Sequence, residues 1–159
     1  MKNKADESGF SLIELLIVIL LINILGAVAI TAYVGIKDKA RRGTMIEMAS
    51  SARSDLQHWL ASSISVNTNI REIDTDFNSV IDGNDSINGV LYNNVAALYT
   101  AGRNTVLGES SPWFNIPLWN TGPPVPGTIS LTQTTPNQIT LVATEKNGQV
   151  IANYIITVD

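Results

Sequence analysis

One carboxylate lies inside the longest apolar stretch of this 159-residue chain. Glu14 is the only charged residue between Phe10 and Ile36. A charge at bilayer depth costs on the order of 3 kcal/mol, so an ionisable side chain in such a stretch usually has a partner or a role. Either Glu14 lies close enough to the end of the stretch for its carboxylate to reach the headgroups, or it pairs with a buried cation. We favour the pairing.

Proteolysis could create the cation that Glu14 needs. Cleavage between Gly9 and Phe10, where a polar head meets the apolar stretch, would leave Phe10 with a free amine. Helix geometry directs this amine away from Glu14 of the same chain, but a neighbouring chain shifted along the helix axis could present its own amine. The attraction is stronger in an apolar medium than in water, although desolvation offsets part of it. We therefore expect Glu14 to act in assembly between copies of the chain.

A second group of oxygen-bearing side chains follows the spacing of a calcium-binding loop. Its members occupy places 1, 3, 5, 9 and 12 of an EF-hand-like pattern: Asp74, Asp76, Asn78, Asp82 and Asp85. Two places depart from that pattern, because Ser79 stands where the sharp turn needs a glycine and Asp85 where the pattern has a glutamate. The alternative is a solvated, turn-rich acidic loop. Calcium is possible here, but we do not favour it.

The composition excludes several kinds of chemistry. The chain has no cysteine and one histidine, His58, which excludes disulfides, thiolate catalysis and metal sites built from cysteines or several histidines. With 10 Lys+Arg against 14 Asp+Glu, it lacks the basic balance of a nucleic-acid-binding protein. No glycine-rich phosphate-binding loop is present. We expect a protein without enzymatic activity, cofactor or nucleic-acid partner.

A long helix must position Glu14. No proline interrupts the chain from Phe10 to Ser63, and this stretch allows one helix of about 54 residues. Beyond the apolar stretch, apolar residues recur at intervals of three and four, which is typical of a helix with one buried face. They are Met45, Met48, Ala49, Ala52, Leu56, Trp59 and Leu60. We predict an apolar membrane half at 10–36 and an amphipathic half at 37–63.

The end of the chain predicts a small antiparallel sheet. Two runs rich in Ile, Val, Thr and Tyr, 138–144 and 149–158, flank Asn147-Gly148, which is the signal of a type I′ hairpin turn. Residues 128–132 add a third strand. This sheet, at 128–159, would pack on the second half of the helix and bury residues of both elements: Leu56, Trp59, Ile139, Leu141, Tyr154 and Ile156. Residues 64–127 show weak periodicity and many turn formers, and we expect variable loops there.

The N-terminal residues resemble a known motif. Residues 9–19 read Gly-Phe-Ser-Leu-Ile-Glu-Leu-Leu-Ile-Val-Ile and are similar to the processing and methylation motif of type IV pilins and type II secretion pseudopilins. The resemblance covers residues 1–50 and implies an α+β, pilin-like fold. It implies that a prepilin peptidase removes the leader peptide 1–9 and methylates the amine of Phe10, and that Glu14 guides assembly against a neighbour's N-terminus. Two positions depart from the family, Asn23 where glycine is frequent and Thr31 where many members have a helix-breaking proline.

The resemblance also implies a function and a location. The expected protein is a structural subunit that polymerises through its N-terminal helix into a type IV pilus or pilus-like filament, with copies of itself and related pilins. It would begin as a single-pass precursor in the lipid bilayer of the bacterial inner membrane, at the assembly platform, with residues 37–159 in the periplasm or outside the cell. The alternatives are a type II secretion pseudopilin of a periplasmic pseudopilus, towards which the absence of a C-terminal disulfide weighs, and a membrane-anchored binding domain.

The charges that flank the apolar stretch favour the opposite orientation. Lys2 and Lys4 precede it, and four cations follow it: Lys37, Lys39, Arg41 and Arg42. The positive-inside rule alone would place residues 37–159 in the cytoplasm. We follow the motif, because a Gly-Phe site beside an intramembrane glutamate is more specific than this difference in charge.

Overall fold

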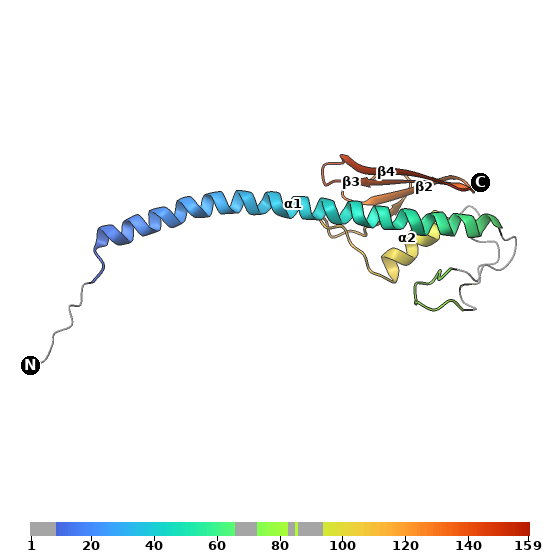
Figure 1. The fold of residues 1–159 in the computed structure, drawn as a ribbon, viewed down its shortest axis with the longest axis horizontal. Helices are drawn as coiled ribbons and strands as arrows, with labels where there is room; N and C mark the ends of the chain where they lie inside the picture. The colour runs from blue at the N-terminus through green and yellow to red at the C-terminus, as the bar shows by residue number, and fades with distance from the viewer. Residues whose placement is uncertain (1–8, 66–72, 83–84, 86–93) are drawn as a thin grey trace, which may run out of the picture. The chain divides into compact units, whose positions relative to one another are not determined.

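The computed structural model describes residues 9–65, 73–82, 85 and 94–159. The chain divides into two compact units, Met1–Ala40 and Arg41–Asp159. Its elements, shown in Figure 1, are α1 (Leu12–Ser65), α2 (Val95–Thr105), β1 (Trp119–Thr121), β2 (Ile129–Thr135), β3 (Gln138–Thr144) and β4 (Val150–Thr157). The predicted α+β architecture is confirmed: one long N-terminal helix packs on a sheet of four strands.

The helix α1 is continuous over 54 residues. It begins two residues after the predicted start and ends two residues after the predicted end. The helix is unbroken at Asn23 and Thr31, and the Thr31 hydroxyl donates a hydrogen bond to the carbonyl of Val28 at 2.9 Å. A proline in place of Thr31 would remove a backbone hydrogen bond, whereas threonine keeps the ladder intact.

The second unit has a core of its own between α1 and the sheet. One face of α1 contributes buried side chains at the predicted spacing: Met45, Ala49, Ala52, Leu56, Trp59 and Leu60. The strands β2, β3 and β4 run beside this part of α1 (Figure 1) and bury Leu131, Ile139, Leu141 and Ile156 against it. Tyr154 is half-buried, with the guanidinium of Arg53 over its ring at 5.4 Å.

The turn between β3 and β4 differs from the prediction. A type I′ turn needs positive φ at both central residues, but only Gly148 has one (φ 82°). Gly148 N–H donates to the carbonyl of Glu145 at 2.9 Å, and Glu145 N–H donates to that of Gln149 at 2.8 Å. This is the pattern of a three-residue loop that ends in a left-handed glycine. The type I′ prediction was wrong because the loop is one residue longer than the Asn-Gly pair.

The sheet is mixed, not purely antiparallel. Its order is β1-β2-β3-β4, and β1 pairs parallel to β2, with Trp119 opposite Ile129. A parallel pair needs a connection that returns along the strand. The connection is made by residues 122–128, which at about 3.3 Å per residue are long enough to return from the end of β1 to the start of β2. They suffice because β1 is only three residues long. The segment 64–127, expected to be loops, therefore contains a strand as well as α2.

From the sequence we expected loops where α2 forms, although asparagine before a helix is a usual start signal. Asn94 precedes it but makes no side-chain capping hydrogen bond. A residue of β2 supplies one instead, since Ala96 N–H donates to Oε1 of Gln133 at 3.2 Å. At its other end, Asn104 pairs with the backbone of Trp119 through both side-chain atoms, at 3.1 Å and 2.8 Å. Asn104 thus satisfies backbone groups at the edge of β1.

Candidate functional site

The start of α1 is capped by two hydrogen bonds between side chains and backbone N–H groups. Ser11 N–H donates to Oε2 of Glu14 at 2.8 Å, and Ile13 N–H points to Oγ of Ser11 at 3.4 Å. This arrangement resembles a capping box, although the Ser11 hydroxyl accepts from the N–H of Ile13 and not from that of Glu14. It satisfies backbone donors that have no partner within the helix. The spacing of Ser11 and Glu14 is the sequence signature of a capping box, and sequence reasoning missed it. The carboxylate of Glu14 is therefore held at the N-terminal end of α1.

The predicted cleavage site lies just outside the helix. Gly9 and Phe10 precede α1 in irregular backbone, and the Phe10 side chain is 83% exposed. The bond between them is therefore not locked in a helix. The rest of the leader peptide 1–9 lies outside the described residues.

The first half of α1 is apolar on every face and exposed throughout. Every large apolar side chain from Phe10 to Ile36 is exposed, with values from 45% at Val18 upwards. By length and composition, α1 is apolar enough near the N-terminus to cross a membrane. A helix that is apolar all round needs lipid or other protein around it.

Comparison with known proteins identifies this region. A family model of the prokaryotic N-terminal methylation motif matches residues 4–30, which include Gly9, Phe10 and Glu14. The chain therefore carries the signal motif of type IV pilins and pseudopilins, as predicted from its sequence. The motif indicates a structural subunit rather than an enzyme and is consistent with an inner-membrane-anchored precursor. No curated protein and no solved structure matches the chain.

The predicted calcium ligands converge only in part. One carboxylate oxygen from each of Asp74, Asp76 and Asp85 lies within 4.8 Å of the others. Asp82 approaches this group through its backbone, since its N–H donates to Oδ2 of Asp85 at 2.8 Å. Asn78 is exposed and donates its side-chain amide to Oδ2 of Asp76 at 3.0 Å.

Backbone donors occupy the carboxylates of this loop. The buried Asp85 accepts on Oδ1 from the N–H groups of Thr75 and Asp76, at 2.7 Å and 3.3 Å. Burial alone would raise the pKa of Asp85, but the N–H donors of Asp82, Thr75 and Asp76 outweigh it and lower the pKa below its ordinary value. Asp74 accepts from Asn78 N–H and Ser79 N–H. The loop is thus organised by its own amides.

The pKa of the neighbouring carboxyl group of Asp76 is raised, in contrast to that of Asp85. Desolvation is the largest cause, and the negative charges of Asp85 and Asp74 add to it; together they raise the pKa of Asp76 although Asn78 N–H donates to it. The carboxylates of Asp74, Asp76 and Asp85 therefore repel one another. Such repulsion is also expected of carboxylates that form a cation site when no cation is bound.

Ser79 adopts the left-handed backbone that the sixth position of a calcium-binding loop requires. Ser79 was expected to resist the left-handed backbone of the sixth loop position, but its φ is 68°. The hydrogen bond from Ser79 N–H to Oδ2 of Asp74, at 2.7 Å, holds it there. Phe77 is also left-handed, with φ 59°, and its ring contacts Trp59 and Tyr99 at centroid distances of 5.8 Å and 5.9 Å. The acidic loop is anchored to the core through this ring.

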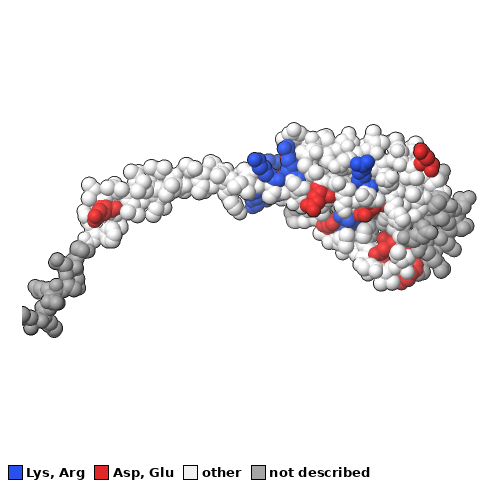
Figure 2. Space-filling model, in the orientation of Figure 1, with Lys and Arg blue, Asp and Glu red and all other residues white. Residues whose placement is uncertain are grey.

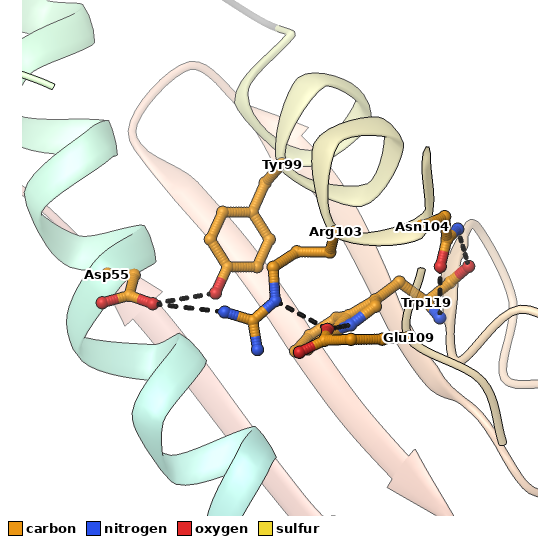
Figure 3. A network of polar contacts seen from close by, with 6 residues as sticks. All are labelled: Asp55, Tyr99, Arg103, Asn104, Glu109 and Trp119. Carbon is orange, nitrogen blue, oxygen red and sulfur yellow. Dashed lines mark hydrogen bonds and ion pairs between the residues drawn. The ribbon is translucent and has the colours of Figure 1, made fainter. Parts of the chain in front are cut away.

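A third polar cluster joins α1, α2 and β1 (Figure 3). Tyr99 Oη donates to Oδ2 of Asp55 at 2.9 Å, and Arg103 Nε donates to Oε2 of Glu109 at 2.8 Å. The guanidinium of Arg103 also lies 3.9 Å from Asp55 and over the rings of Tyr99 and Trp119, at 5.4 Å and 4.8 Å. Trp119 Nε1 donates to the same oxygen of Glu109.

This cluster holds elements together and is not arranged as a nucleophile beside a base. Burial, against the opposing effect of Arg103, raises the pKa of Tyr99 far above its ordinary value of 10.0. Tyr99 therefore stays neutral and acts as a hydrogen-bond donor. Its partners come from segments distant in the sequence, and sequence reasoning had no signal for them.

Proposed function

We propose that this chain is a structural subunit that polymerises through the first half of α1 into a type IV pilus or pilus-like filament. The observation that carries the proposal is the methylation motif at 4–30, continuous with a helix whose apolar side chains are exposed on all faces. Such a helix is stable in a bilayer and, once extracted, among other helices of the same kind.

The motif residues take three roles in this proposal. A prepilin peptidase cuts between Gly9 and Phe10 and methylates the new amine of Phe10. Glu14 then pairs with the N-terminal amine of a neighbouring copy at the assembly platform. The position of Glu14 at the start of its helix supports this pairing, because a neighbour shifted along the axis brings its own N-terminus to that level.

The proposal includes the route of the chain. It starts as a single-pass precursor in the bacterial inner membrane, with the leader in the cytoplasm, and ends outside the cell in a filament of copies of itself and related pilins. A periplasmic type II secretion pseudopilus is the second candidate. The absence of cysteine, and thus of the disulfide frequent in surface pilins, supports it.

The N-terminus of the mature protein tests the processing step. The full chain is expressed in a bacterium that has a prepilin peptidase and an assembly system, and the N-terminal peptide is analysed by mass spectrometry. We expect it to begin at methylated Phe10. A mature chain that begins at Met1, or beyond Ala32, would contradict the proposal.

Filament yield tests the role of Glu14. Glu14→Ala in cells without the wild-type chain should lose most filaments, whereas Glu47→Ala, which removes an exposed carboxylate from the other half of α1, should assemble normally. Normal yield from Glu14→Ala would refute the pairing. Filaments sheared from the cell surface indicate a pilus, and filaments retained in the periplasm indicate a pseudopilus.

A further inference from the structure

Four cations follow the apolar half of α1 within six residues. We call them the basic segment: Lys37, Lys39, Arg41 and Arg42. Asp38 is the only carboxylate among them, and the Lys37 and Lys39 side chains are exposed. In Figure 2 a group of blue side chains lies along α1, and the helix before it shows no blue. The filament role assigned to Glu14 does not account for this charge.

The basic segment surrounds its helix. At about 100° per residue, Lys37 and Arg41 lie on one side of α1, and Lys39 and Arg42 lie on the opposite side. A single protein partner would contact cations gathered on one face. Headgroups of a bilayer, in contrast, surround a spanning helix on every side, so this distribution favours lipid.

The basic segment also lies at the depth of the headgroups. From Leu15 to Ile36 the helix rises about 33 Å, close to the roughly 30 Å of a bilayer's hydrocarbon core. With Glu14 at one boundary of the core, Lys37 reaches the other. Cations near an anionic membrane surface are attracted to it, by an amount that falls within a Debye length.

Two of the four cations also interact within the protein: Arg41, which is half-buried, and Arg42. Arg42 forms an ion pair with Glu145, at the turn between β3 and β4. The attraction to a membrane therefore rests mainly on Lys37 and Lys39, which are exposed.

We propose that the basic segment binds anionic phospholipid headgroups, on the side of the membrane where residues 41–159 lie. The inference rests on the membrane anchoring in the proposed function but is independent of the orientation of the chain. It also gives a reason for the excess of cations on this side of the span, which the positive-inside rule does not explain for an exported domain.

The test compares the lipids that surround the reconstituted full chain. The purified protein is inserted into vesicles of phosphatidylcholine with or without phosphatidylglycerol, and spin-labelled forms of each lipid report their preference for the protein boundary. At low salt we expect phosphatidylglycerol to be preferred by about threefold, and the preference to fall as salt screens the charges. The double variant Lys37→Gln/Lys39→Gln should reduce it towards equality.

Arg53→Gln/Lys146→Gln is the matched control. It also removes two positive charges, but from exposed residues of the second unit, and should leave the lipid preference unchanged. All variants keep Lys2 and Lys4, so a difference between them reports the basic segment alone.

The outcomes distinguish a failure of the lipid contact from a failure of the membrane anchoring in the proposed function. A chain that inserts, as shown by flotation with the vesicles and resistance to alkaline extraction, but shows equal preference for both lipids overturns only the lipid contact. If Lys37→Gln/Lys39→Gln loses filaments and keeps its lipid preference, the segment contacts protein, and the inference is wrong. A chain that fails to insert overturns the membrane anchoring and this inference together.

Discussion

At the scale of single residues, the carboxylate of Glu14 can serve its own helix and a neighbour together. Its Oε2 accepts the backbone N–H of Ser11 at 2.8 Å, and an ionised carboxylate has about four acceptor positions on its two oxygens. The hydrogen bond to Ser11 therefore leaves room for an amine. Because Ser11 holds Glu14 at the helix start, the carboxylate is oriented before a neighbouring chain arrives.

Arg103→Met should lower the free energy of unfolding by about 2–3 kcal/mol. The change leaves Glu109, whose side chain is 19% exposed, without its cation, and it also removes the contact with Asp55. Urea unfolding, followed by tryptophan fluorescence, measures the loss. Arg53→Met is the control: Arg53 is exposed and lies over Tyr154, so its loss should cost less than about 1 kcal/mol. Equal losses would contradict the role of the cluster.

Tyr99→Phe should make stability less dependent on alkaline pH. The pKa of Tyr99 is raised in the folded chain, so its stabilising contribution is complete below the ordinary tyrosine pKa of 10.0 and is lost as pH rises above that value. The variant loses the hydrogen bond to Asp55, which costs about 1 kcal/mol at neutral pH. Between neutral pH and about pH 11, its free energy of unfolding should fall less than that of the wild type. A parallel fall would show that Tyr99 ionises freely.

At the scale of elements, the ring of Phe77 packs closely against α2 and so connects the acidic loop to that helix. Gly102 of α2 leaves room for Phe77, since a Cβ at this position would lie 2.2 Å from Cε2 of Phe77. The loop is thereby linked to the aromatic contacts of Trp59 and Tyr99. The conformation of the loop and the packing of α2 are coupled.

Gly102→Ala should therefore destabilise the second unit by about 1–3 kcal/mol, because the ring of Phe77 must move. Gly43→Ala in α1 is the matched control, since a Cβ there meets nothing within 4 Å and alanine favours a helix by about 0.5–1 kcal/mol. Chemical denaturation of both variants measures the difference. If both substitutions shift stability in the same direction, the packing argument is wrong.

Calcium should leave the melting temperature nearly unchanged. The carboxylates of Asp74 and Asp85 already accept backbone N–H groups, and a cation would have to compete with these donors. Thermal melts in calcium and in a chelator test this. Binding at 100 times the dissociation constant would add about 2.7 kcal/mol, which shifts the melting temperature by several degrees. Such a shift, abolished by Asp82→Ala, would contradict the prediction and establish a calcium loop.

At the scale of the whole molecule, the two units depend on different surroundings. The unit Met1–Ala40 has no buried apolar side chain among its described residues, and it needs lipid or other helices. The unit Arg41–Asp159 has its own core between α1 and the sheet. The first unit is suited to assembly, and the second folds by its own packing.

A chain that lacks residues 1–36 should therefore be soluble, folded and monomeric without detergent. Its core residues, from Met45 to Ile156, are all retained. Circular dichroism and size-exclusion chromatography measure folding and mass, with the full chain in detergent as the reference. Aggregation of the truncated chain, or loss of its helical signal, would show that the second unit depends on the first.

The sequence by itself determined the features that depend on neighbouring residues. The processing motif, the long helix and the strand at 138–144, which has the same bounds in the structure, follow from local patterns of apolar residues and from the absence of proline. The start of α1 could also have been predicted from the spacing of Ser11 and Glu14, which is the signature of a capping box, but our prediction did not use it.

Only the tertiary structure decided the features that depend on distant contacts. Tyr99 and Asp55 meet across 44 positions of sequence, and the capping of Ala96 by Gln133 spans 37. The parallel pairing of β1 with β2 likewise depends on a partner strand that no local pattern specifies. A side chain's propensity is worth a fraction of a kcal/mol, whereas satisfying a buried polar group is worth about 1–3 kcal/mol, so packing overrides the local preference at these places.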